Sequence, residues 1–147
     1  TDLLRAARLV RDVSSRYFHP DIQTEEGKKY WKNLQSVRKE NIANQKKLFD
    51  SIPIKIVATH NSMIIGIVTG TDNELLMIFV RPSFHKKGIA TQLFTRYKNL
   101  VIKNGSNYIK VKSSRYAERF YQKVGFVRTG DEKLIYGLPA IPMAMTL

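Results

Sequence analysis

The sequence predicts an α/β domain in which a mixed β-sheet is flanked by helices. Two apolar runs, Met63–Val68 and Leu75–Val80, have six residues each, the length of a buried strand. Apolar residues recur at helical spacing in residues 2–19 and again after Ile89. A length of 147 residues suits one domain, and the sequence shows no internal repeat, low-complexity stretch or linker. A mixed sheet with helices between its strands accommodates this order.

The first third of the chain is predicted to be helical. The first helix, over residues 2–19, ends at Pro20 because a proline disfavours helical geometry in the residue before it. Thr24 has the side chain of an N-cap, and two glutamates follow it in the first turn, where the helix dipole favours negative charge. This second helix is expected to run to about Leu34. A third helix, polar and rich in lysine, is expected over Val37–Phe49.

A β-hairpin is predicted next. The β-branched residues of Ile54–Thr59 and Met63–Thr69 indicate two strands, and His60–Ser62 between them indicates a tight turn. Another turn, at Thr71–Asn73, leads into an apolar strand over residues 74–80. We expect this strand to be buried near the centre of the sheet.

A long helix and several shorter elements complete the predicted fold. The helix begins at Ile89 and stops at Asn104-Gly105, a typical C-terminal signal. The elements expected after it are a short strand at Tyr108–Val111, a helix from Ser114 to Val124, a strand at Phe126–Thr129, a loop at Gly130–Pro139 and a last strand at Ile141–Leu147.

The segment that joins the apolar strand to the long helix is the most informative part of the sequence. The first N–H groups of a helix have no intrahelical partner, and the helix dipole makes them attractive to anions, phosphates above all. Lys86 and Lys87 add positive charge in the turn, and Gly88 allows the backbone to approach a ligand because it has no Cβ. The segment therefore indicates a phosphate-binding turn at the end of a strand.

The charge balance favours anionic partners. The chain has 25 Lys and Arg against 12 Asp and Glu, a formal net charge of +13. A surplus of this size suits a nucleotide-like cofactor, an acidic substrate, RNA or membrane headgroups. The basic residues are spread along the chain without a block of five or six. A solvated basic surface without a specific partner therefore remains an equal alternative.

Several kinds of chemistry are excluded or disfavoured by composition. There is no cysteine, so the chain has no disulfide, thiolate metal site or cysteine nucleophile, which is compatible with the cytoplasmic location that we expect. The histidines His19, His60 and His85 lie far apart, so no metal site is expected. Apolar runs of six residues are too short to span a membrane, and no signal peptide is visible.

Two motifs resemble those of the GNAT N-acetyltransferases, and they occur in the order that this family requires. Its motif A, written Arg/Gln-x-x-Gly-x-Gly/Ala, is matched by His85-Lys86-Lys87-Gly88-Ile89-Ala90, downstream of Phe79-Val80-x-Pro82. Its motif B, commonly Asn-x-x-Ala-x-x-x-Tyr-x-x-x-Gly-Phe, is matched by Ser114-x-x-Ala117-x-x-Phe120-Tyr121-x-x-x-Gly125-Phe126. The ending Ile141-Pro142-Met143 is similar to the last strand of many small bacterial members. His85 and Ser114 depart from the family's usual Arg or Gln and Asn.

The resemblance covers residues 52–147 well and residues 1–50 more loosely. It implies the GNAT fold, a mixed central sheet with splayed central strands, and acetyl-CoA as cosubstrate without a metal. It also implies that the turn binds the pyrophosphate through backbone N–H groups and that the preceding strand offers its edge to the pantetheine arm. The family's first strand has no counterpart before residue 2, which we expect to reflect a trimmed start of a single GNAT domain. The residues that the resemblance assigns to acetyl-CoA are Ile78, Phe79, Val80, His85, Lys86, Lys87, Gly88, Ile89, Ala90, Thr91 and Ser114.

Two residues are assigned catalytic roles by the resemblance. An alkyl amine with a pKa of about 10.4 is protonated at neutral pH and must lose a proton before it attacks a thioester. Glu74 occupies the position of the glutamate base of histone-acetylating members, and we expect it to act through water. Tyr121 occupies the position of the family's tyrosine, which protonates the departing thiolate. A solvent-facing glutamate and a core tyrosine are the respective alternatives.

The acceptor and the partners are less constrained. The resemblance implies a primary amine on a small molecule or a peptide, and direct attack in a ternary complex. A basic nucleic-acid-binding or ribosome-associated module that keeps the GNAT scaffold without catalysis is the alternative function, motivated by the charge of +13. Neither a membrane partner nor a metal is expected, nucleic acid is not the favoured partner, and a homodimer is left open.

Overall fold

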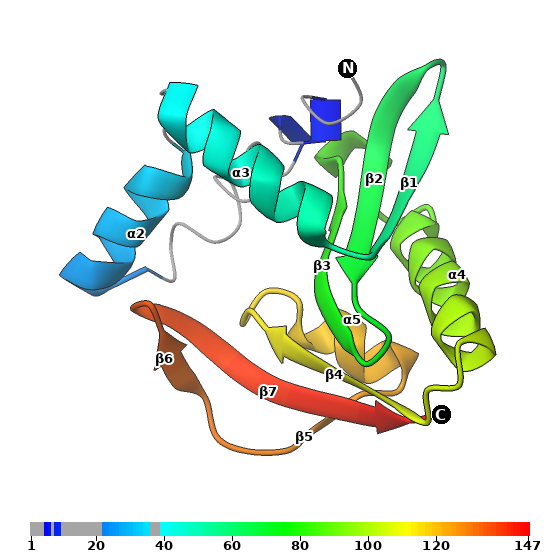
Figure 1. Cartoon of the computed structure of the whole chain (residues 1–147). Coiled ribbons are helices and arrows are strands. Elements are labelled where there is room, and N and C mark those ends of the chain that lie inside the picture. The colour runs from blue at the N-terminus through cyan, green and yellow to red at the C-terminus, as the bar shows by residue number, and fades with distance from the viewer. Residues whose placement is uncertain (1–4, 7, 10–21, 36–38) are drawn as a thin grey trace.

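The sheet of this protein divides into two halves that meet at its centre. The computed structural model describes residues 5–6, 8–9, 22–35 and 39–147. The strands within these ranges are β1 (Ile54–His60), β2 (Met63–Gly70), β3 (Glu74–Val80), β4 (Tyr108–Ser113), β5 (Val127–Arg128), β6 (Lys133–Ile135) and β7 (Leu138–Thr146). Their order is β1-β2-β3-β4-β7-β5, with β6 paired to β7 (Figure 1). The pair β3–β4 is parallel and the others are antiparallel, so the predicted mixed sheet is confirmed.

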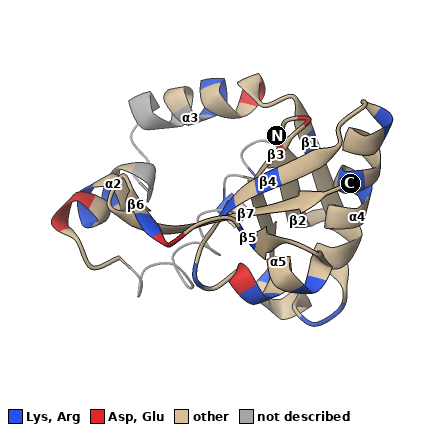
Figure 2. Ribbon diagram, turned by 90° about the horizontal axis from the view of Figure 1, so that it is seen from below, with Lys and Arg blue, Asp and Glu red and all other residues tan. Residues whose placement is uncertain are grey.

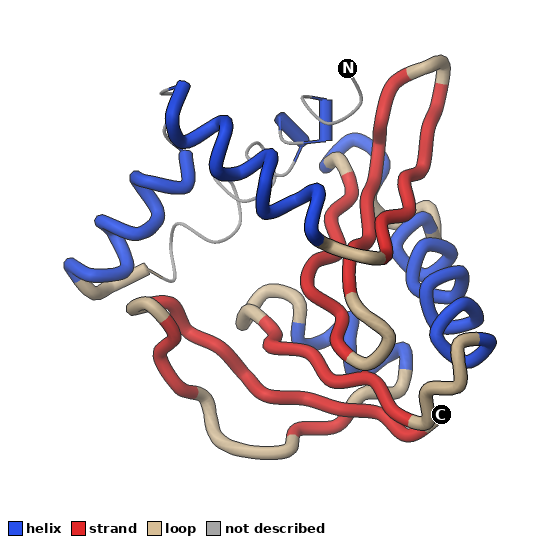
Figure 3. The backbone as a smooth tube through the Cα atoms, viewed as in Figure 1, coloured by secondary structure: helices blue, strands red, loops and turns tan. Residues whose placement is uncertain are grey.

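Helices lie on both sides of the sheet (Figure 3). They are α2 (Glu25–Gln35), α3 (Lys39–Ser51), α4 (Ile89–Lys103) and α5 (Glu118–Val124), with a 3₁₀ turn, η2, at Pro82–Phe84. Residues of α4 and α5 join Val68 and Val111 in the larger core on one face. On the opposite face, Leu9 of the N-terminal helical residues and Phe49 of α3 pack around Ile67. We call β1, β2 and β3 the first half-sheet and β4, β7 and β5 the second. Each face of the first half-sheet is therefore covered by its own apolar cluster.

Most of the predicted elements are confirmed. The β1–β2 hairpin turns at Asn61 and Ser62, both in the left-handed region with φ of 49° and 62°. Thr24 caps α2, because its Oγ1 accepts a hydrogen bond from the N–H of Gly27 at 3.0 Å. Helix α4 ends at its predicted stop signal, with Asn104 as the C-cap.

Other predicted elements differ in extent or lie outside the described residues. The helix predicted over residues 2–19 is described only at 5–6 and 8–9, which are helical; its remaining positions lie outside the description. Ser114 caps a turn instead of α5 itself, because its Oγ accepts a hydrogen bond from the N–H of Ala117 at 3.2 Å and α5 begins at the next residue. Local capping chemistry was predicted at the right residue, although the helix starts later.

The loop predicted over residues 130–139 is wrong, because this segment forms a second hairpin. Strands β6 and β7 pair across a turn at Tyr136 and Gly137, with φ of 52° and 77°. The Tyr-Gly pair lacks the Asn or Asp that usually announces such a turn. Pro139 lies within β7, but β4 pairs with β7 only from Ile141 onward, so the missing N–H of the proline interrupts no ladder with β4.

The two half-sheets separate because β3 and β4 pair over only two positions. These are Glu74 with Lys110 and Leu75 with Val111. The ladder between β2 and β3 shifts register at the same level, since Thr69 pairs with Met77 whereas Gly70 pairs with Leu75. One extra residue, Leu76, therefore forms a β-bulge in β3, and bulges bend a strand and increase its twist. The strands diverge directly after it.

Helix α2 is joined to the β6–β7 turn by backbone contact. A Cβ added to Gly27 would lie 2.5 Å from the carbonyl oxygen of Gly137, and one added to Gly137 would lie 2.4 Å from the nitrogen of Gly27. The hydroxyl of Thr24 donates a hydrogen bond to the same carbonyl at 2.9 Å. The rings of Tyr30 and Tyr136 stack beside this contact, with centroids 5.0 Å apart and an angle of 10° between planes. Two glycines thus permit an approach that no other residue pair would allow.

The contact between the two glycines should be visible in the stability of a Gly137→Ala variant. A left-handed φ costs an L-residue about 1–2 kcal/mol, and the clash with the backbone of Gly27 adds to this. Gly105→Ala is the matched control, because Gly105 has φ of 92° but nothing within 4 Å of an added Cβ. Urea unfolding should show a larger loss of unfolding free energy for Gly137→Ala than for Gly105→Ala. Equal losses would contradict a tight contact.

Candidate active site

The edge of β3 that faces β4 is open beyond the bulge. The N–H of Arg81 donates to the carbonyl of Ile65 on β2 at 2.7 Å. Backbone groups alternate between the two edges of a strand, so those of Ile78 and Val80 face away from β2 and toward the diverging β4. Because β4 pairs only with the first two residues of β3, these backbone groups have no strand partner in the described structure. An extended ligand arm can pair with such an edge.

The turn after β3 presents bare backbone. Lys86 and Gly88 both have left-handed backbone conformations, with φ of 61° and 76°. This conformation is strained for Lys86, because it is an L-residue with a Cβ. A Cβ added to Gly88 would meet no atom within 4 Å, so the space beside this glycine is open. The N–H of Gln92 donates to the carbonyl of Gly88 at 3.0 Å, which places the three preceding N–H groups in the unpaired first turn of α4. These are backbone features that an anion-binding turn requires, and binding itself stays a prediction.

Two basic side chains of this turn are engaged by the protein. Nε2 of His85 lies 2.7 Å from the carbonyl oxygen of Val80, and a carbonyl only accepts, so Nε2 donates in this pair. The ammonium of Lys87 lies 5.4 Å from the centroid of the Phe84 ring, a cation–π distance. These contacts leave the backbone as the principal source of donors for a phosphate. The predicted role of His85 toward the cosubstrate stays a prediction.

Tyr121 is buried in the larger core, on the face of the sheet that α4 and α5 cover. Only 4% of the residue is exposed, and its ring makes edge contacts with Phe120 and Phe126 at centroid distances of 5.5 and 5.4 Å. Burial raises the pKa of its hydroxyl well above the ordinary value. The phenol is therefore protonated at neutral pH, the state that a proton donor requires.

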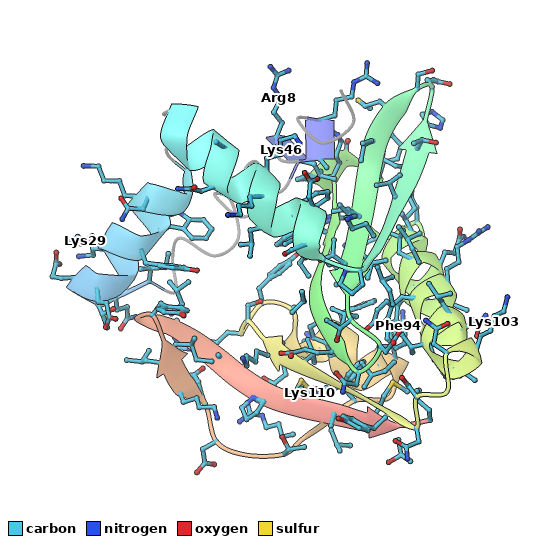
Figure 4. The ribbon with its side chains drawn as sticks, viewed as in Figure 1. Arg8, Lys29, Lys46, Phe94, Lys103 and Lys110 are labelled. Atoms are coloured by element: carbon cyan, nitrogen blue, oxygen red, sulfur yellow. The ribbon has the colours of Figure 1, made fainter. Side chains whose placement is uncertain are left out.

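Glu74 lies where β3 pairs with β4, beside two lysines of β4. Its carboxylate is 3.9 Å from Nζ of Lys110 and 3.8 Å from Nζ of Lys112, and its side chain is 22% exposed. Of these three residues, Figure 4 labels Lys110. The lysines alternate along β4 with the buried residues Ile109 and Val111. Glu74 thus belongs to the face of the sheet opposite α4 and α5.

The two candidate catalytic residues occupy opposite faces of the sheet. Tyr121 packs in the core that α4 and α5 form, whereas Glu74 faces the other side with the lysines. In a continuous sheet the strands would separate them. Here β3 and β4 pair only as far as Leu75 and Val111, so no strand hydrogen bonds join the two halves of the sheet beyond this level.

The remaining predicted residues lie at the start of α4, in β3 and directly after β4. Ile89 and Ala90 are partly buried against the larger core at the start of α4, and Thr91 is exposed beside them. Phe79 faces the opposite cluster, and Ser114 follows the end of β4, with its Oγ engaged by Ala117. The predicted cosubstrate residues thus lie on β3 and in the segment that follows it, except Ser114, which makes a local cap after β4. Their roles toward the cosubstrate stay predictions.

Sequence reasoning missed the lysines beside Glu74 and the tyrosine pair. Lys110 and Lys112 alternate with apolar residues, a signal that places both on one face of a strand. Only the order of the strands, which no local pattern reveals, brings that face to Glu74. Tyr30 and Tyr136 meet only because residues 133–140 form a hairpin.

The described surface carries its positive charge on several elements. Figure 2 shows Lys and Arg on both helices and strands without a single basic block. Among the described residues, no cluster of His, Asp and Glu has the composition of a metal site. None of the described helices combines the length and the apolar character needed to cross a membrane.

The family of the chain follows from this arrangement and from its match to a family model. The model of the acetyltransferase (GNAT) domain matches residues 18–147. The chain belongs to the GNAT acetyltransferase family, and the motif-based prediction is confirmed. It is therefore an N-acetyltransferase with acetyl-CoA as its cosubstrate, which suits the open backbone around Gly88.

Solved structures support the fold. A GCN5-related N-acetyltransferase from Rhodopseudomonas palustris is similar with a TM-score of 0.80 and 20% identity, covering 99% of this chain and 90% of that one. The PaiA N-acetyltransferase from Thermoplasma acidophilum, solved with coenzyme A, has a TM-score of 0.71 at 20% identity, covering 99% and 93%. An aminoglycoside 6′-N-acetyltransferase complexed with coenzyme A has a TM-score of 0.66 at 14% identity, covering 98% and 89%. At these identities the likeness shows the fold.

The burial of Tyr121 predicts a pH dependence of stability. In the unfolded chain this tyrosine loses its proton near pH 10, about its ordinary pKa, whereas burial keeps it protonated in the folded protein. Above about pH 10 the unfolded state binds fewer protons, so the unfolding free energy falls by up to about 1.4 kcal/mol per pH unit through this group. The unfolding free energies of the wild type and of Tyr121→Phe, measured with urea, should differ by a constant amount up to about pH 9.5. Above this pH the unfolding free energy of the wild type should fall more steeply than that of the variant. A difference that does not change with pH would contradict the burial.

Proposed function

We propose that the chain transfers the acetyl group of acetyl-CoA to a primary amine by direct attack in a ternary complex. The observation that carries this proposal is the divergence of β3 and β4, with Tyr121 on one face of the sheet and Glu74 on the other. The cosubstrate would enter from one side and the amine from the other. Their reacting atoms would then meet where β3 and β4 cease to pair, between a proton acceptor and a proton donor.

Backbone groups account for most of the proposed cosubstrate binding. The N–H groups of Lys86–Thr91 would hold the pyrophosphate, since they surround the left-handed Gly88 and the unpaired first turn of α4. The open edge at Ile78 and Val80 would pair with the amides of the pantetheine arm. His85 already occupies the carbonyl of Val80, so we assign the pairing to the N–H of Val80 and to both backbone groups of Ile78.

The chemical step needs one proton acceptor and one proton donor. Glu74, through water, takes a proton from the substrate ammonium, and the free amine nitrogen attacks the carbonyl carbon of the thioester. As the new C–N bond forms and the C–S bond breaks, Tyr121 gives its proton to the departing sulfur. The amine nitrogen releases its second proton to solvent, and the tyrosine recovers its own. Because the chain has no cysteine, no acetyl-thioenzyme lies on this route.

The surroundings of Glu74 constrain the acceptor. Lys110 and Lys112 place two positive charges beside one carboxylate, so a polycationic amine would be repelled as it approaches. We therefore propose a small-molecule primary amine that carries few other positive charges. One structural relative is named for an aminoglycoside acceptor. In this chain, the two lysines beside Glu74 disfavour an acceptor with as many positive charges as an aminoglycoside.

Coenzyme A should stabilise the folded protein through the turn at Gly88. A ligand at 100 times its Kd adds about 2.7 kcal/mol of apparent stability. Gly88→Ala should lose this stabilisation, because its Cβ enters the space that is open beside the backbone. Gly105→Ala also adds a Cβ to a left-handed glycine, but far from the turn, and should keep it. Thermal unfolding with millimolar coenzyme A measures both; no shift in the wild type would contradict the proposed site.

The two catalytic roles predict different pH profiles. Glu74→Gln should lower kcat/KM for an alkyl amine by roughly 10²–10⁴ at pH 7, and the deficit should shrink toward the amine pKa of about 10.4. Tyr121→Phe should lower kcat without such recovery and should leave coenzyme A binding unchanged. Release of coenzyme A can be followed with a thiol reagent, since the protein has no cysteine of its own.

Either role can be refuted separately by the same assay. A Glu74→Gln deficit that stays constant with pH would remove the role of proton acceptor. Full turnover by Tyr121→Phe would remove the role of proton donor.

A further inference from the structure

The turn between β2 and β3 holds Glu74 by its backbone. The N–H of Glu74 donates to Oγ1 of Thr71 at 3.1 Å, and the carbonyl oxygen of Glu74 accepts from the N–H of Thr71 at 2.9 Å. Oγ1 of Thr71 also accepts a hydrogen bond from the N–H of Asn73 at 3.4 Å. One threonine therefore engages the N–H and the carbonyl of the glutamate, so a displacement of Thr71 would displace Glu74.

A tyrosine of α4 holds this threonine in place. The hydroxyl of Tyr97 donates to the carbonyl oxygen of Thr71 at 2.7 Å. Tyr97 is completely buried, and a buried tyrosine hydroxyl needs such a partner. Burial, and after it the negative charges of Asp72 and Glu74, raise the pKa of this hydroxyl well above its ordinary value. The hydroxyl therefore keeps its proton at neutral pH and remains a donor.

Gly70 allows the tyrosine and the glutamate to approach the same point of β2. A Cβ added to Gly70 would lie 2.5 Å from the carbonyl oxygen of Glu74 and 2.8 Å from the hydroxyl oxygen of Tyr97. The ring of Tyr97 belongs to the larger core on the α4 face. The carboxylate of Glu74 lies on the opposite face, beside Lys110 and Lys112. The tyrosine thus reaches the glutamate through the backbone of the turn.

We propose that Tyr97 is a positioning residue for Glu74 in the acetyl-transfer reaction. Through Thr71 it fixes the backbone from which the carboxylate reaches the substrate ammonium, and this inference rests on the proposed role of Glu74 as proton acceptor. A misplacement of about 1 Å can cost an enzyme on the order of 10²-fold in rate. Helix α4 also begins at Gly88, so the same helix would place both the pyrophosphate and the proton acceptor.

The Tyr97→Phe variant tests this role, because it removes the hydroxyl and keeps the ring. It should lower kcat/KM for an alkyl amine by about tenfold or more at pH 7. The deficit should shrink toward the amine pKa of about 10.4, since a free amine needs no proton acceptor. Release of coenzyme A, followed with a thiol reagent, measures both effects. A deficit that stays constant with pH would overturn the positioning role.

Val101→Ala is the matched control for a loosened core. Val101 is completely buried in the same helix and the same core, but its side chain makes no hydrogen bond to the turn. This variant should lose unfolding free energy in urea and keep its kcat/KM. An equal loss of kcat/KM in both variants would assign the effect to core packing and would overturn the proposal.

A double variant shows whether the tyrosine acts through Glu74. In the Glu74→Gln background, Tyr97→Phe should lower kcat/KM no further, because no proton acceptor remains to be positioned. A loss by the same factor in both backgrounds would overturn the proposal. Thr71→Val removes the hydroxyl that accepts the N–H of Glu74 and should show the same pattern. It provides the test at a partly exposed position if Tyr97→Phe does not fold.

The failure of this inference can be told apart from that of the proposed function. Full kcat/KM in Glu74→Gln alone would show that the glutamate is not the proton acceptor, and the positioning role would fall with it. A loss in Glu74→Gln, together with full kcat/KM in both Tyr97→Phe and Thr71→Val, would overturn the positioning role alone. Circular dichroism verifies that each variant is folded.

Discussion

The early end of the ladder between β3 and β4 is the constraint on which the rest of this structure depends. Two pairs of residues join the half-sheets, and the bulge at Leu76 bends β3 away immediately afterwards. Backbone groups at Ile78 and Val80 are left without a strand partner as a result. A fully paired sheet with the same side chains would lack this edge. The proposed pairing with the pantetheine arm therefore depends on hydrogen bonds that the strands do not make.

Since the strands contribute so little to the junction, other contacts must hold the half-sheets together. On one face, the rings of Phe94 in α4 and Phe126 meet at 5.6 Å within the larger core. At the paired end of the two strands, Asp72 accepts hydrogen bonds from Asn104 and Ser106, and the N–H of Lys110 donates to the carbonyl of Asn73 at 2.9 Å. The junction of the half-sheets is thus held by polar contacts at one end and by apolar packing on one face.

Local chemistry explains why much of the fold was predictable from sequence, and its limits explain the errors. Thr24 caps a helix and Asn104 ends one because capping depends on a few neighbouring atoms. The motifs around Gly88 and Tyr121 were likewise predictable, since each lies within one strand–turn–helix or helix. The bulge at Leu76 has no local signal, because it lies within a continuous apolar run. The turn at Tyr136 was not predicted, because it lacks the Asn or Asp typical of such turns and a proline follows it closely. Contacts such as Glu74 with Lys112 depend on strand order, which a local pattern cannot contain.

The glycine pair that joins α2 to the β6–β7 turn also limits how related chains can vary. Backbone touches backbone at Gly27 and Gly137, so no change of rotamer can absorb an inserted residue on either side. A longer turn would require a matching displacement of the helix along its axis, and a deletion in the helix would require a shorter turn. Insertions and deletions in these two distant segments should consequently occur together.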